Sequence, residues 1–514
     1  MKSRMENLTP MSILFDRKEN RTFLFLALAA SIIIFIVFKY FYPYPNFIHG
    51  DSFVYISMAY SNPKIGTYPI GYPMFLRLFS VFSTSDTALV AFQYFFLQAG
   101  IVFFLLTVFD LCGSLKITKI IAFLFFLLTP VNIYLANYIS SDSIFCALSL
   151  IWFAQIITVI YRPTRLLIIS NAIILVLLFM IRYNALFYPL ITLTALFIGN
   201  EARRLKLIGM LLSLVLIGLF IRYTQNDYLR LSGHRQFSPF SGWQLANNAL
   251  YSYRYVDSSK RKTLPVRFHK LDKMVRNYFD STRDVKKYPW ETLEASTVYM
   301  WDARSPLSLY ADDLIRDDSV KGKLRRWAKA APIMKEYGTE LIKTYPSEFI
   351  NHYLLPNSMK YYAPPVEFLE VYNNGVDSVN DIASTWFNYK SNKIFTRASE
   401  GAAGWLSYYS VAVGTMNVLL LANVISFLIL KFYKRFEYIN KLLILIFILW
   451  MTNFTFSVFA SPIALRFQMF AIFVYSALVF VLMERLILIA FERDVCAKIN
   501  YKDNGWHSVF GEQK

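Results

Sequence analysis

Residues 47–78 read FIHGDSFVYISMAYSNPKIGTYPIGYPMFLRL, and they directly follow an apolar run of membrane-span length at 23–42. The stretch contains Asp51, four tyrosines and a Tyr-Pro-Ile-Gly-Tyr-Pro element. A carboxylate just beyond a membrane-spanning helix is costly unless it is solvated or used by the protein. The alternative is a wet loop, since loops are polar by default. We favour a functional loop, because the rest of the chain places more acids and arginines at the same membrane face.

Composition places the chain in a broad class. Its 514 residues are 56% hydrophobic and 18% aromatic, which is too apolar for an ordinary soluble protein. The formal charge is +19, but the basic residues lie in short loops between apolar runs, so we predict a bilayer and no nucleic acid as partner. Three distant cysteines without CxxC spacing and five scattered histidines predict neither a disulfide framework nor a metal site.

The apolar runs predict an all-α polytopic membrane protein with about ten transmembrane helices. The first run has a long polar leader and no cleavage site after it, so we expect it to be retained as a helix. The predicted spans are 23–42, 87–111, 117–135, 141–160, 166–181, 185–198, 205–221, 405–430, 441–461 and 462–489. The predicted organisation is a cytoplasmic leader (1–22), a membrane module (23–222) with a catalytic first outer loop (43–86), an extracytoplasmic domain (223–404), C-terminal membrane helices (405–490) and a cytoplasmic tail (491–514).

Loop charges predict the orientation. With the N-terminus inside, every predicted inner segment is basic, as the positive-inside rule requires. These segments are 2–21, 113–119, 161–165, 199–206, 431–441 and the C-terminal tail. Both termini are therefore expected in the cytoplasm, and the short basic tail without a retention signal favours a bacterial inner membrane. The domain at 223–404 falls outside, and amphipathic patterns at 335–349 and 365–372 predict that it is mostly helical.

Four candidate residues then share the outer boundary. Asp51 is a candidate general base, because a carboxylate can accept the proton of an attacking hydroxyl or amine. Asp142 begins a predicted span and can cap that helix, belong to a site, or do both. Arg182 and Arg466 suit a lipid phosphate, since a guanidinium binds phosphate bidentately. The alternative for Arg182 is an arginine that extends to the interface.

Further candidates surround these four. Lys64 and Arg77 are additional candidate phosphate-binding residues. The candidate substrate-binding residues are His49, Tyr55, Tyr68, Tyr72 and Tyr183. Tyrosines near a membrane boundary also serve as interfacial anchors, which is the alternative for each of them.

In their order, these features resemble the GT-C superfamily of polytopic membrane glycosyltransferases. The shared features are an acid in the first outer loop, the Tyr-Pro-x-Gly-Tyr-Pro element, an acid at the head of the fourth span, an Arg-Tyr-Asn turn, a polar outer domain and a late Arg-Phe. The resembling branches are the protein O-mannosyltransferase and aminoarabinose-transferase types, which use polyprenyl-phosphate-linked sugars. The resemblance covers 47–187 best and does not extend convincingly over 223–404.

The resemblance implies an inverting transfer of a sugar from a polyprenyl-phosphate donor to an unidentified acceptor at the outer face. It makes Asp51 the base, Asp142 the second acid of the site, and Arg182 and Arg466 the phosphate-side groups. Many relatives carry an Asp-Glu pair in the first loop, whereas Ser52 follows Asp51 here. We therefore predict no obligatory cofactor or metal, and a divalent cation is left open.

Other classes fit parts of the pattern. A secondary transporter would place ionisable residues near span midpoints and repeat its halves, whereas here the charges gather at the outer boundary and the halves differ. A polymerase or ligase of lipid-linked glycans would share the polarity and chemistry. A non-catalytic membrane subunit of cell-envelope glycan assembly would need 223–404 and dispense with Asp51.

Overall fold

The computed structural model describes residues 18–161, 163–199, 203–281, 296–316, 322–399, 401–460 and 462–502. Within these residues the regular structure is helical, apart from two isolated β-bridges. The all-α class is thereby confirmed. Most of the predicted leader (1–17), the end of the tail (503–514) and positions 162 and 200–202 of two predicted basic loops lie outside the described residues.

Seven helices of the described chain are long and apolar enough to cross a membrane. They are α3 (Lys18–Phe41), α6 (Asp86–Cys112), α9 (Asp142–Tyr161), α12 (Arg203–Ser232), α21 (Tyr408–Ile429), α23 (Glu437–Ala460) and α24 (Leu465–Lys502). This supports a multi-pass membrane protein. The predicted count of ten is not confirmed, because the other three predicted spans are shorter or interrupted.

The predicted span at 117–135 is two helices, α7 (Lys116–Leu127) and α8 (Val131–Ala136). The break falls at Thr129-Pro130, since proline lacks the N–H that continues a helix and disfavours helical geometry in the residue before it. At 1.5 Å per residue, α7 covers only about 18 Å of a hydrocarbon core about 30 Å thick. The predicted spans at 166–181 and 185–198 form α10 (Arg165–Ile181) and η1–α11 (Tyr183–Phe187 and Tyr188–Ile198), both apolar but short.

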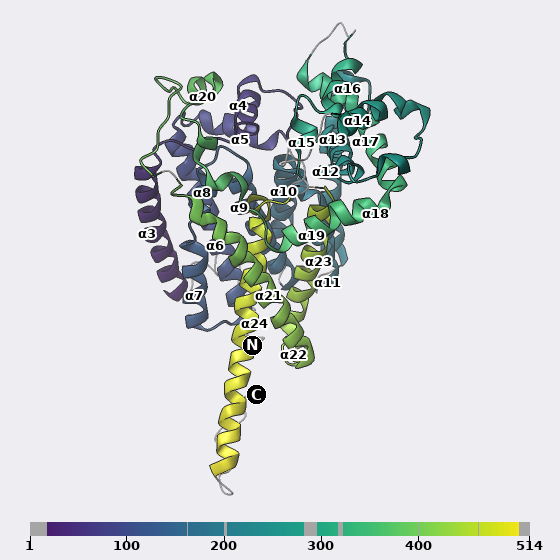
Figure 1. The fold of residues 1–514 in the computed structure, drawn as a ribbon. Coiled ribbons are helices and arrows are strands. Elements are labelled where there is room, and N and C mark those ends of the chain that lie inside the picture. The colour runs from purple at the N-terminus through teal and green to yellow at the C-terminus, as the bar shows by residue number, and fades with distance from the viewer. Residues whose placement is uncertain are drawn as a thin grey trace.

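The long helices lie side by side in a bundle (Figure 1). Helices α6, α9 and α24 are mostly buried, whereas α3, α12 and α21 expose most of their apolar surface, as helices facing lipid do. The short helices α4 (Ser52–Ser61), α5 (Gly71–Ser80) and α20 (Asp381–Trp386) lie at one end of the bundle. The opposite end carries α22 (Phe432–Arg435) and the projecting C-terminal half of α24.

The region 223–404 has two parts that pack differently. The first is a helical unit with its own apolar core, in which Trp243 stacks on Trp327 with ring centroids 4.6 Å apart. Its helices are α13 (Phe240–Tyr253), α14 (His269–Ser281), α15 (Val298–Trp301), α16 (Pro306–Leu314), α17 (Lys323–Thr344) and α18 (Pro346–Phe349). Helix α19 (Leu355–Tyr362) follows, and its Tyr361 packs with Val458 of α23. The second part, 364–404, belongs to the core of the bundle through Val366, Leu369 and Phe387. Helix α12 runs without a break across residue 222, where the predicted domain boundary lies.

Candidate functional site

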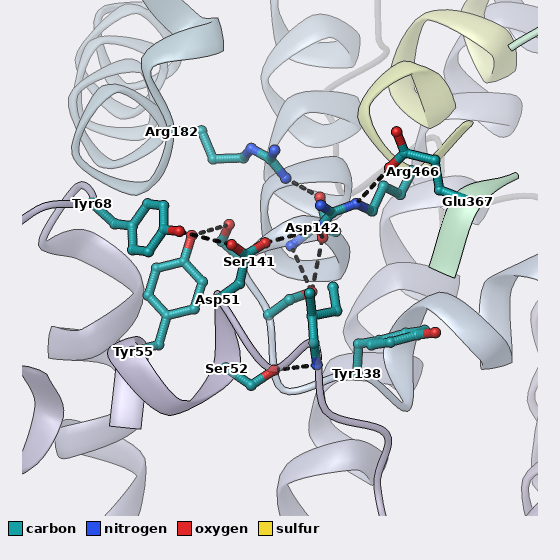
Figure 2. A network of polar contacts seen from close by, with 12 residues as sticks. Asp51, Ser52, Tyr55, Tyr68, Tyr138, Ser141, Asp142, Arg182, Glu367 and Arg466 are labelled. Carbon is teal, nitrogen blue, oxygen red and sulfur yellow. Dashed lines mark hydrogen bonds and ion pairs between the residues drawn. The ribbon is translucent and has the colours of Figure 1, made fainter. Parts of the chain in front are cut away.

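The four predicted charged residues lie at helix ends on one side of the bundle. Asp51 precedes α4 and Asp142 is the first residue of α9. Arg182 follows α10, and Arg466 is the second residue of α24. Figure 2 shows their side chains pointing toward one another from four separate elements. The structure therefore brings together residues that are up to 415 positions apart in the sequence.

A tight turn presents Asp51. The N–H groups of Asp51 and Ser52 both donate to the carbonyl of Ile48, at 2.9 and 2.7 Å. The Ser52 hydroxyl accepts from the N–H of Ile48 at 2.9 Å, and its side chain is fully buried. Ser52 thus closes the turn from inside. This gives a structural reason for the serine at position 52.

Asn46 fastens this loop to its neighbours. Its N–H donates to the Asn137 carbonyl at 2.8 Å, and its own carbonyl accepts from the N–H of Ile139 at 3.1 Å. Its side-chain oxygen accepts from the N–H of Asn373 at 2.6 Å. One buried asparagine therefore joins the loop between α3 and α4, the turn that leads to α9 and the segment near Asn373. These bonds set the separation of Asp51 and Asp142.

Gly71 lets the Tyr-Pro-Ile-Gly-Tyr-Pro element lie directly on the end of α10. A Cβ at this position would lie 2.6 Å from the carbonyl carbon of Met180 and 2.7 Å from the nitrogen of Ile181. These are backbone atoms, which cannot rotate aside. The glycine therefore sets how closely α5 approaches the end of α10 that carries Arg182.

Arg466 joins the two aspartates. Its Nη1 lies 3.1 Å from Asp51 Oδ2 and 3.3 Å from Asp142 Oδ2 (Figure 2). Arg182 forms an ion pair with the other oxygen of Asp142. The hydroxyl of Ser140 donates to Asp142 Oδ2 at 2.9 Å, and the hydroxyl of Tyr68 donates to Asp51 Oδ1 at 2.9 Å. We call Asp51, Asp142, Arg182 and Arg466 the charged cluster.

Burial separates the roles of the two aspartates. The side chain of Asp142 is 1% exposed, and it is held by two arginines and a serine. A buried charge needs such partners, because desolvation is otherwise prohibitive. Asp51 is 22% exposed, so it is the carboxylate that an incoming molecule can reach. Asp142 is better placed to hold the arginines than to exchange protons with a substrate.

The predicted aromatic residues divide into two sets. Tyr68 and Tyr55 border the charged cluster, and the hydroxyl of Tyr55 is hydrogen-bonded to that of Ser141 at 3.3 Å. Tyr72 is fully buried and donates to the side-chain oxygen of Gln93 at 2.8 Å, which is a core position. Tyr183 packs against Phe237, with ring centroids 5.1 Å apart.

Three other predicted residues lie outside these contacts. His49 is half-buried, with its ring 5.3 Å from that of Phe53. Lys64 is exposed on the loop between α4 and α5. Arg77 is also exposed, and it donates to the Ala59 carbonyl at 3.2 Å near the end of α4, where a basic side chain compensates the helix terminus. None of the three makes the hydrogen bonds or ion pairs that define the charged cluster.

Sequence reasoning missed Glu367, and it gave no role to Phe467 of the late Arg-Phe pair. Glu367 Oε2 lies 3.9 Å from Arg466 Nε (Figure 2). Burial raises the pKa of Glu367, although Arg466 and Lys360 oppose that shift. The guanidinium carbons of Arg182 and Arg466 lie 4.6 and 4.3 Å from the centre of the Phe467 ring. The position of Phe467 directly after Arg466 could have indicated that it belongs to the site. Glu367 lies in a polar region, where nothing in the sequence distinguishes it from the other acids.

Among the described residues, no group of three or more His, Cys, Asp or Glu side chains could hold a metal ion. The carboxylates at this site are arranged around guanidinium groups instead. No family model, curated protein or solved structure matches the chain. The function is therefore argued from the geometry of the site.

Proposed function

We propose that the protein is an integral-membrane glycosyltransferase that moves a sugar, with inversion, from a polyprenyl-phosphate donor to an acceptor at the extracytoplasmic face. The observation that carries this is the charged cluster itself. A reachable carboxylate, Asp51, lies within hydrogen-bonding distance of Arg466, and Arg466 and a second arginine share one buried acid. A base beside paired guanidinium groups is what transfer from a phosphate donor requires.

The proposed reaction divides between these groups. Asp51 accepts the proton of the acceptor hydroxyl or amine as that atom bonds to the anomeric carbon of the sugar. The bond from the anomeric carbon to the phosphate oxygen breaks, and the polyprenyl phosphate leaves with the bonding electron pair. Arg182 and Arg466 stabilise the charge that develops on this phosphate. A guanidinium has five N–H donors, so one arginine can hold a carboxylate and a phosphate together.

The neighbouring groups support this division. The Tyr68 hydroxyl holds one oxygen of Asp51 while Arg466 holds the other, which orients the carboxylate. The ring of Phe467 lies against both guanidinium groups, and an aromatic face attracts cations. Asp142, held by both arginines, keeps the two positive side chains close together.

The proposed placement in the membrane follows the loop charges. We count the short apolar helices α10 and α11 and the interrupted α7–α8 pair as crossings in addition to the seven long helices. That gives ten crossings, with both termini in the cytoplasm of a bacterial inner membrane and the charged cluster at the outer boundary. The exposed apolar faces of α3, α12 and α21 then face lipid.

The test compares the wild type with Asp51→Asn, purified in detergent and matched for unfolding temperature. Each is mixed with radiolabelled polyprenyl-phosphate sugars and a membrane extract as the source of acceptor. Asp377→Asn, which changes an exposed acid of the segment that follows α19, is the matched control. We expect transfer by the wild type and the control, and a loss of about a hundredfold or more in Asp51→Asn.

Equal transfer by Asp51→Asn would remove Asp51 from the role of base while keeping the reaction class. The absence of transfer by folded wild type across a broad donor panel would overturn the glycosyltransferase proposal. Transport assays in proteoliposomes would then be the next measurement.

A further inference from the structure

The backbone attaches Glu367 beside Arg466. We call residues 364–370 the strap. The carbonyl of Pro365 accepts from the N–H of Leu465 at 2.8 Å, and Leu465 directly precedes Arg466. The carbonyl of Pro364 accepts from the hydroxyl of Ser410 at 2.7 Å. Val366 and Leu369 are buried in the bundle core, so Glu367 lies between two anchored positions.

Glu367 has an unfavourable backbone conformation. Its φ is +55°, in the left-handed region that disfavours residues with a Cβ and favours glycine. Other described residues with positive φ include Asn373 and Asn374, and asparagine tolerates this region better than glutamate does. Such a conformation persists when the surroundings impose it, and it is enriched at functional sites.

We propose that Glu367 is a positioning residue that holds the Arg466 guanidinium in the orientation in which Nη1 reaches both Asp51 and Asp142. This inference rests on the function proposed above. Glu367 faces Nε, whereas the two aspartates face Nη1, so carboxylates hold the guanidinium at two of its nitrogens. The separation of 3.9 Å is that of an ion pair and exceeds hydrogen-bonding distance.

The charges around Glu367 come from three elements: Arg466 on α24, Lys360 on α19 and Asp51 on the first outer loop. Despite the two cations, burial dominates and raises the pKa of Glu367. Keeping this carboxylate ionised in the folded protein therefore costs free energy of folding. A purely structural acid would stabilise the fold, whereas an acid retained for function can destabilise it.

The test measures the kcat and donor KM of transfer, together with the unfolding midpoint at neutral pH. It compares wild type, Glu367→Gln, Glu367→Asp and Glu370→Gln, the last being the matched control from the same strap. In Glu367→Gln we expect kcat to fall about tenfold to a hundredfold because Arg466 is misplaced. We expect the donor KM to stay within about threefold and the unfolding midpoint to stay equal or rise. Glu367→Asp keeps the charge and is expected to recover part of kcat, and Glu370→Gln is expected to match the wild type.

Three outcomes would overturn this inference. The first is a kcat of Glu367→Gln equal to that of Glu370→Gln and wild type, which leaves the proposed function intact. The second is a clearly lower unfolding midpoint in Glu367→Gln, with Glu367→Asp no more active than Glu367→Gln, which assigns Glu367 a structural role. The third is a folded wild type that transfers no sugar, which overturns the proposed function as well.

Discussion

Two guanidinium groups share one aromatic ring and one acid at this site. Arg182 and Arg466 both lie against Phe467, and both pair with Asp142. Like charges at such short range repel, so their proximity needs compensation from the acid and from the electron-rich ring face. The result is a compact pair of arginines, with Asp51 at its exposed side. That arrangement is the physical basis for expecting a phosphate there.

A residue-scale prediction concerns pH. The pKa of folded Glu367 lies above its ordinary value of 4.5, because burial disfavours the charge. Between pH 4.5 and the higher pKa of the folded state, Glu367 binds more protons in the folded protein than in the unfolded chain. The contribution of Glu367 to stability is therefore fully present below about pH 4.5 and is lost as pH rises through the folded pKa. Unfolding midpoints of wild type and Glu367→Gln should be measured from about pH 4.5 to about pH 8. As the pH rises, the midpoint of the wild type should fall relative to that of Glu367→Gln. Parallel curves would contradict the prediction.

The sequence identifies part of this site. Asp51, Asp142, Arg182 and Arg466 each adjoin a long apolar run, and loop charges assign all four to one face, so their shared sidedness could be predicted. Their direct contact could not, because it depends on Asn46 and Gly71 bringing loops and helix ends together. The inward packing of Tyr72 is a related case. This tyrosine belongs to a motif next to the site, but its hydroxyl turns inward to Gln93.

At the scale of elements, the glycine of the Tyr-Pro-Ile-Gly-Tyr-Pro segment determines how closely α5 packs against the end of α10. Gly71→Ala would push α5 off the end of α10, because the new Cβ meets the backbone of Met180 and Ile181. We expect a stability loss of about 1–3 kcal/mol and a loss of transfer, since Arg182 follows that end of α10. Gly50→Ala is the matched control from the loop before α4, where a Cβ meets nothing within 4 Å. The checks are unfolding in detergent and the transfer assay. Equal behaviour of the two variants would contradict the role of this close approach.

Some helices could be located from the sequence and others could not, and the reason is physical. Helices α6, α9 and α24 are long apolar runs with no internal proline, so hydropathy alone locates them. The run at 117–135 is equally apolar, but Thr129-Pro130 divides it, and hydropathy does not register that break. The region 223–404 was expected to be mostly helical, and its described part is. Its division into a separate helical unit and a segment packed on the bundle depends on long-range burial, which no local pattern encodes.

For the whole molecule, the proposed ten crossings make a prediction about sidedness. Cysteines would be placed singly at the exposed positions Lys64, Lys390, Lys116, Thr164 and Lys434, in a background with Cys496→Ser. Cys112 and Cys146 are buried and stay in place. Because each crossing reverses the side of the chain, a membrane-impermeant maleimide should label positions 64 and 390 in intact cells. Positions 116, 164 and 434 should react only after permeabilisation. Labelling of position 164 in intact cells would reduce the three proposed crossings between positions 64 and 164 to an even number. It would also place the Asp142 end of α9 and the Arg182 end of α10 away from the outer boundary. The proposed site would then lose the sidedness that a lipid-phosphate donor at the outer face requires.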